Sequence, residues 1–230
     1  MPDGASALHL VLGGDPTLYS IVRLSLIVSL SAAALAAAIG MPFGAYLALV
    51  RFPGRAFLVV LLNACMGLPP VVVGLAVYLL LSRSGPLGFL GVLFTPKAMI
   101  LAQSLLVLPI IAALTRQTIE DLWVEYRDEL TAMRVGALSR VATLLWDARF
   151  SLVTTMLAGF GRAAAEVGTV MIVGGNIEGF TRTMTTTITL ETSKGDLPLA
   201  MGLGLILISI IVAVNALAWS ARRLGEIRAG

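Results

Sequence analysis

Five long apolar runs follow one another along the chain. They cover residues 24–50, 57–81, 98–114, 152–173 and 199–219. A helical membrane span needs about 20 predominantly apolar residues, whereas a barrel strand shows about 10 residues of alternating polarity. The pattern therefore predicts an all-α integral membrane protein with about five transmembrane helices, forming a single transmembrane domain over residues 1–230.

Small and helix-breaking residues modify two of these runs. The middle of the first run is rich in alanine, serine and glycine, which predicts close packing against another helix. The second run is interrupted by Gly67, Pro69, Pro70 and Gly74. Two adjacent prolines free backbone carbonyls, so this segment must face a protein neighbour or a water-filled cavity. A structural kink and a pore-lining role both fit that pattern.

A polar island at residues 118–149 separates the third and fourth runs. Its charged residues are interleaved with apolar ones at steps of three or four, which places the apolar side chains on one helical face. This apolar stripe consists of Leu122, Tyr126, Leu130, Met133, Ala137, Val141 and Leu144. Gly136 lies near its middle, where a helix is disfavoured by roughly 1 kcal/mol. We expect two short amphipathic helices that meet at Gly136 on one side of the membrane.

The composition excludes several classes of function. Charged residues make up 13% of the chain against about 25% in soluble domains, which supports a membrane location. Cys65 and His9 are the only cysteine and histidine, so we expect no metal site and no catalytic residues. No P-loop sequence occurs, so the chain cannot by itself be a P-loop ATPase. Arginines at helix ends explain the net charge of +3 better than nucleic-acid binding does.

The distribution of basic residues predicts the orientation. With five spans, one face collects Arg51, Arg55, the arginines at 116, 127, 134, 140 and 149 and those after residue 220, and the other collects Arg83, Lys97, Arg182 and Lys194. The positive-inside rule makes the first face cytoplasmic. The amino terminus and a threonine-rich loop at 174–198 are then outside, and the carboxyl terminus is inside. Residues 1–17 lack the basic start of a signal peptide, so we expect no cleavage.

Arg162 and Glu166 are the only charged residues within a predicted span. They are four apart, so they share a helix face and can pair. The pair either locks helix packing or places Arg162 beside a water-filled path for an anion. In the external loop, Asn176, the glycines before it and the threonine hydroxyls could contact a hydrated oxyanion. A loop that only connects two spans fits equally well.

The island resembles the coupling loop of ATP-binding-cassette (ABC) importer permeases. The family pattern E-A-A-x-x-x-G is matched by Ala132 and Gly136, with Glu129 one place early. The segments SRSGPLG (82–88), GRAAAEVG (161–168) and MIVGGNI (171–177) resemble the molybdate and tungstate branch of these permeases. The segment MTTTITLETSKGD (184–196) is most similar to the tungstate-specific permeases.

The resemblance implies an ABC type I importer permease fold, in a transporter whose pore, ATPase and binding protein are separate subunits. Two copies of the chain would form the pore in a bacterial or archaeal plasma membrane, surrounded by lipid. Two ABC ATPase subunits would dock on the coupling loop at 118–149, and an external binding protein would deliver the oxyanion. The chain would bind no cofactor itself, because ATP and Mg²⁺ would belong to the ATPase. The implied coupling residues are Glu129, Leu130, Ala132, Met133, Gly136, Ala137 and Val141.

Two alternatives remain open from the sequence. The apolar stripe of the island could pack on the chain's own spans instead of in an ATPase groove. The chain could also be a self-contained secondary transporter or channel for a small anion. Ion coupling in such a carrier needs titratable groups within the membrane, and only Arg162 and Glu166 qualify.

Overall fold

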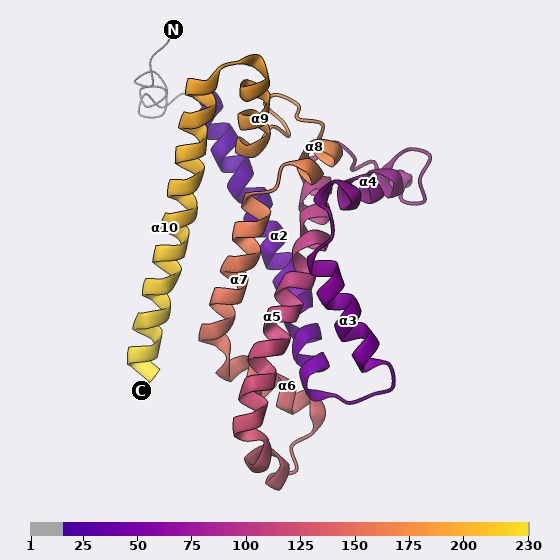
Figure 1. Cartoon of the computed structure of the whole chain (residues 1–230), viewed down its shortest axis with the longest axis vertical. Coiled ribbons are helices and arrows are strands. Elements are labelled where there is room, and N and C mark those ends of the chain that lie inside the picture. The colour runs from indigo at the N-terminus through magenta and orange to yellow at the C-terminus, as the bar shows by residue number, and fades with distance from the viewer. Residues whose placement is uncertain (1–15, 230) are drawn as a thin grey trace.

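A computed structural model describes residues 16–229, excluding the side chains of 221, 222 and 224–229. Our expectations for His9 and for nearly all of the amino-terminal segment lie outside these residues. Every regular element within the described part is a helix (Figure 1). The helices are α2 (Pro16–Leu49), α3 (Arg55–Met66), α4 (Pro70–Leu81), η1 (Gly88–Leu90), α5 (Pro96–Ala132), α6 (Ala137–Asp147), α7 (Arg149–Ala164), α8 (Gly168–Gly174), α9 (Met184–Lys194) and α10 (Leu197–Ala229). The all-α membrane architecture predicted from the sequence is confirmed.

The core forms where α2 and α5 pack along each other, with α7 against both. Small residues make this approach possible. A Cβ on Gly44 would lie 2.2 Å from the carbonyl oxygen of Ala112, and one on Gly159 would lie 2.7 Å from Cδ1 of Ile111. Ala32, Ala33 and Ala36 are fully buried on the same side of α2. The close helix packing expected from the first apolar run is therefore present.

Two of the predicted spans are sharply broken. α3 and α4 meet at 102° across Gly67–Pro69, so the second run is far more than a kinked helix. The fourth run, expected as one span over 152–173, divides into α7 and the short α8 at 165–167. Three helices are long and apolar enough to cross a membrane alone, and the count rises to five if each of two bent pairs is one span. The second such pair is α6 with α7, at 78°.

The polar island also differs from expectation. Its first half is not a separate helix, because α5 continues without a break through Pro109 and on to Ala132. The turn after α5 relies on Arg134, which adopts φ 51°, while Gly136 has an ordinary φ of −66° and is the N-cap residue just before α6. The second amphipathic helix is present as α6. The predicted bend thus lies a few residues before Gly136.

The elements gather at two opposite ends of the molecule (Figure 1). α4, α8 and α9 lie at the end where α2 begins, and α6, the start of α3 and the end of α10 lie at the other. The two groups of basic residues counted in the sequence are separated in the same way. α10 stands apart from the rest: only 11% of its apolar segment is buried, and it packs mainly on α9 and α7.

Candidate functional site

The polar residues buried at membrane depth meet where α7 ends and α8 begins. Glu166 lies in the three-residue break and is only 4% exposed. Its carboxylate accepts a hydrogen bond from Arg162 at 2.7 Å and one from the backbone N–H of Thr169 at 3.1 Å. The predicted Arg162–Glu166 pair is therefore confirmed as an ion pair. The second contact shows that Glu166 also satisfies a backbone donor that the first turn of α8 leaves without an intrahelical partner.

The same junction reaches the broken second span. The hydroxyl of Thr169 donates to the carbonyl of Pro70 at 2.7 Å, which satisfies a group near the α3–α4 break. Glycines let α4 and α8 touch: a Cβ on Gly74 would lie 2.9 Å from Cα of Thr169. The sequence predicted that this proline-containing segment would face a protein neighbour or a water-filled cavity, and the structure places α8 against it.

The threonine-rich segment 174–198 is not the open loop that we expected. It contains α9, whose capping residue Thr183 accepts from the N–H of Thr186. Thr185 donates to the carbonyl of Glu166 at 2.9 Å, and Thr187 donates to the carbonyl of Thr183 at 2.7 Å. These hydroxyls stabilise the chain's own backbone. They are therefore not displayed toward an external anion.

Asn176 lies at the far end of α8 from Glu166, next to Gly175. Both residues have positive φ, 50° for Asn176 and 71° for Gly175, which reverses the chain after α8. The side-chain oxygen of Asn176 is buried and has no hydrogen-bond partner within residues 16–229. The structure therefore brings Arg162 and Glu166 together, while Asn176 occupies a separate place at the other end of α8.

Sequence reasoning missed Gln103. It is 2% exposed on α5, and its Nε2 donates to the carbonyl of Ala163 in the last turn of α7 at 3.0 Å. The available signal was a single amide side chain in an otherwise apolar run, which at membrane depth needs a polar partner. That partner could not be identified without the fold.

At the opposite end, the proposed coupling residues divide into two groups. Leu130 and Val141 are each 9% exposed and pack with Ala45, Ile119 and Leu144 in the chain's own core. These two side chains are thus not available to a partner, contrary to our expectation for the stripe. The remaining members are exposed at the end of α5, on the turn and at the start of α6: Glu129, Ala132, Met133, Gly136 and Ala137.

Leu138 is a second residue that the periodicity missed. It is 78% exposed at the second position of α6, and Met133, which caps the end of α5, is 74% exposed, so a large apolar side chain is exposed on each side of the turn. A Cβ on Gly136 would meet nothing within 4 Å. Leu138 follows Ala137 of the stripe by one position, and the signal was a large apolar residue at the start of a predicted amphipathic helix.

Charged and aromatic groups mark this end as a membrane boundary. Glu120 accepts from Arg55 at 2.7 Å and from Arg116 at 2.6 Å, which ties α3 to α5. All three tryptophans lie near arginines: Trp123 beneath Arg140, Trp146 beneath Arg149 and Trp219 beneath Arg223, at 5.1–5.4 Å from ring centroid to guanidinium carbon. Tryptophan and arginine concentrate at membrane–water interfaces.

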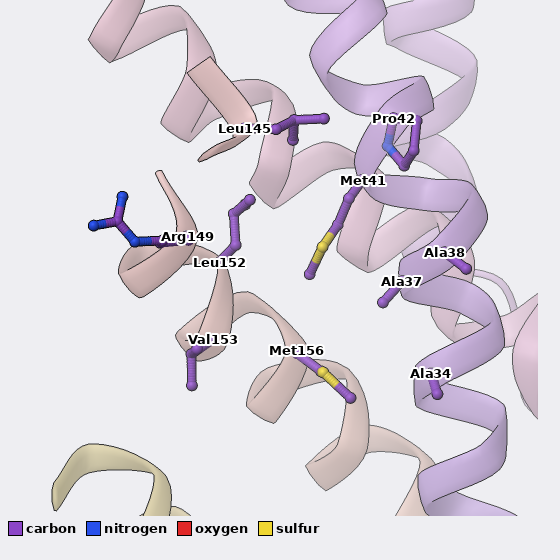
Figure 2. Close-up of a pocket in the computed structure, with 10 residues that line it drawn as sticks. All are labelled: Ala34, Ala37, Ala38, Met41, Pro42, Leu145, Arg149, Leu152, Val153 and Met156. Atoms are coloured by element: carbon purple, nitrogen blue, oxygen red, sulfur yellow. The ribbon is translucent and has the colours of Figure 1, made fainter. Parts of the chain in front are cut away.

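An apolar pocket lies between α2 and the α6–α7 corner (Figure 2). It encloses about 570 Å³, and its walls are apolar apart from Arg149 at the edge. Figure 2 shows the guanidinium of Arg149 extending away from the pocket. An oxyanion needs hydrogen-bond donors, so this pocket does not suit one. Within residues 16–229, no group of three or more His, Cys, Asp or Glu side chains is placed to hold a metal ion.

These features define a helical membrane protein, with broken spans joined by buried polar contacts at one end and an exposed amphipathic helix at the other. Comparison with known proteins gives the particular family. No family model matches the chain. A probable anion ABC transporter permease from Haloferax volcanii is 44% identical over 87% of this chain and 88% of its own length. The tungstate uptake permease TupB of Peptoclostridium acidaminophilum is 40% identical over 94% of both. The molybdenum transport permease ModB of Escherichia coli is 32% identical over 90% of this chain and 96% of its own length. The chain belongs to the ABC transporter permeases, in the branch that contains these proteins.

Proposed function

We propose that this chain is the membrane subunit of an importer that brings tungstate, or the closely similar molybdate, into the cell. The observation that carries this proposal is the identity of 40% to a tungstate uptake permease over nearly the full length of both proteins. Two copies would enclose the path, in the plasma membrane of a bacterium or archaeon. An external binding protein would deliver the anion to the end with α4, α8 and α9.

The energy would come from a partner ATPase that holds ATP and Mg²⁺, because this chain has no P-loop. Met133, Ala137 and Leu138 would contact that ATPase, with Glu129, Ala132 and Gly136 around them. Their exposure and apolar character support the assignment, since a large exposed apolar patch at the rim of a polar surface marks an interaction site. Leu130 and Val141 would act indirectly, by fixing α6 to α2 and α5.

The Arg162–Glu166 pair and Asn176 would lie on or beside the anion's path. Arg162 is 34% exposed, so its guanidinium keeps access to the surface while it pairs with the buried carboxylate. A fixed positive charge with part of its surface open can attract a dianion without binding it irreversibly. Arg162→Ala should then lower uptake, and Arg162→Lys should retain part of it.

The proposal is tested by reconstituting this chain with its ATPase and binding protein in liposomes. Tungstate should accumulate only when ATP is present at the ATPase side, and the chain alone should accumulate none. Gly136→Trp tests the contact with the ATPase separately from folding. The space around Gly136 within the chain is empty, so the fold should tolerate the indole. It should leave ATP hydrolysis running while uptake falls.

The outcome also separates this function from a self-contained carrier. Uptake driven by an ion gradient in liposomes that contain only this chain would support a secondary transporter instead. Normal ATP-driven uptake by the Gly136→Trp variant would leave the transporter assignment intact but remove α6 from the coupling role.

A further inference from the structure

A small polar cavity lies inside the helix bundle, behind the break between α7 and α8. Its volume is about 10 Å³, and it is lined by Ser25 and Ser29 of α2, Gln103 of α5, Glu166 of the break, and Thr183, Met184 and Thr185 at the start of α9, with small apolar residues between them. A cavity of about 10–15 Å³ is enough for one water molecule, and too small for an oxyanion. Any ligand here must therefore be of water size.

Gln103 supplies the reason to expect a ligand. Its side chain is 2% exposed, and its Nε2 is fixed by the hydrogen bond to the carbonyl of Ala163. That bond assigns the amide orientation, because the carbonyl oxygen of Ala163 can only accept. The Oε1 of Gln103 is left buried with no partner within residues 16–229. A buried amide oxygen in a native protein is normally satisfied by a protein group or by an ordered water.

The other lining groups favour a neutral donor. The carboxylate of Glu166 is already paired with Arg162 and with the N–H of Thr169, so no excess negative charge calls for a cation. The hydroxyl of Ser25 accepts from the N–H of Met184 at 2.8 Å and donates to the carbonyl of Ile21. Water can donate to Gln103 and still accept from or donate to the surrounding hydroxyls.

We propose that this cavity binds one water molecule, held by Oε1 of Gln103 and the hydroxyl of Ser29. The water joins α2 to α5, whose Gln103 is in turn bonded to the end of α7 where that helix is broken. At membrane depth, ordered water is one of the few ways to satisfy polar groups near a broken helix. The site is independent of which anion the protein transports, and its test does not read transport.

X-ray radiolysis followed by mass spectrometry tests the proposal on the purified, full-length protein. Radiolysis generates hydroxyl radicals from a bound water in place, and methionine sulfur captures them. Met184 lines the cavity and is 1% exposed, whereas Met99 is equally buried but packs against Gly174. Met184 should be oxidised well above Met99, and a bulk radical scavenger should suppress oxidation of exposed Met133 but not that of Met184.

Ser29→Val should abolish the excess oxidation of Met184, because its methyl groups fill the space of the water. Ser104→Ala is the matched control: Ser104 is a buried serine whose hydroxyl bonds to the carbonyl of Ile100, and it does not line the cavity. If Ser29→Val fails to fold, Gln103→Met provides a second variant, because it removes the amide oxygen that accepts from the water. The comparison of Met184 with Met99 in the unaltered chain needs no variant. Oxidation of Met184 no higher than that of Met99, or suppression by the scavenger in parallel with Met133, would overturn the proposal.

Discussion

Gly44 sets how closely α2 and α5 can approach. A Cβ at this position would lie 2.2 Å from the carbonyl oxygen of Ala112, and backbone atoms in a packed helix cannot yield easily. Gly44→Ala should therefore destabilise the protein by about 1–3 kcal/mol, the usual cost of overpacking. Thermal unfolding in detergent measures the effect. Gly204→Ala in α10 is the control, since the space around Gly204 is empty and alanine favours the helix. Equal unfolding temperatures for the two variants would contradict this account.

The Arg162–Glu166 pair allows structure and transport to be separated. Arg162→Ala leaves a carboxylate that is 4% exposed without its counter-charge, which should cost about 1–3 kcal/mol of stability. Adding Glu166→Gln removes that charge and retains an oxygen that can accept from the N–H of Thr169. The double variant should therefore be more stable than the sum of the single changes by about 0.5–3 kcal/mol. Denaturation midpoints of all four proteins give this coupling.

Transport by the double variant then decides the role of Arg162. If uptake recovers together with stability, the pair serves only to lock the break. If uptake stays low in a stable protein, the guanidinium acts on the anion.

Residue spacing made the pair predictable because both residues follow the same helical turn. The bond from Gln103 to Ala163 was not predictable, because it joins α5 to α7 and depends on the packing of the whole bundle.

At the scale of the element, α6 shows why periodicity identifies a helix but not its neighbours. The steps of three and four placed Val141 and Leu144 on one face correctly, and both are buried. The same steps cannot tell whether that face meets the chain itself or another protein. In the structure this face of α6 packs against α2 and α5. The surface that remains available to a partner is therefore the one that carries Leu138.

This division predicts opposite outcomes for two substitutions three residues apart in α6. Leu138→Asp should leave folding unchanged, because the side chain is 78% exposed, but should uncouple ATP hydrolysis from uptake. Val141→Asp should reduce the amount of folded protein in the membrane, because it buries an unpaired charge. Membrane abundance, unfolding temperature and the ratio of uptake to ATP hydrolysis are the measurements. Full coupling in a stable Leu138→Asp protein would remove this residue from the ATPase contact.

The two helix breaks differed in how well the sequence predicted them. Pro69 and Pro70 indicated the break between α3 and α4, because proline cannot continue a helix without losing a backbone hydrogen bond. The second falls at 165–167, where Ala165, Glu166 and Val167 include no helix breaker. That break is stabilised by contacts with distant parts of the sequence: Thr169 donates to Pro70, Thr185 donates to Glu166, and Gln103 donates to Ala163. Local propensity therefore could not locate it.

At the scale of the whole molecule, α5 is the element that joins the two functional ends. Its 37 residues extend for about 55 Å as a regular helix. Near its start it carries Gln103, which contacts the broken end of α7, and the turn toward α6 follows its last residue. A movement of α6 imposed by a partner can thus be transmitted along one continuous helix to the polar junction. The exposed apolar face of α10 leaves room for a second copy or lipid beside this core.

The excess of arginines at the α6 end predicts that this end faces the cytoplasm, and the orientation can be measured directly. Cys65 is the only cysteine, so a Cys65→Ser background accepts single new cysteines without interference. Ser139 on α6 and Ser193 on α9 are both exposed and lie at opposite ends of the molecule. In intact cells, a membrane-impermeant maleimide should label Ser193→Cys and spare Ser139→Cys, and permeabilisation should make both react. The reverse pattern would place α6 outside the cell, where no ATP-hydrolysing subunit could reach Met133 and Leu138, and the proposed coupling would fail with it.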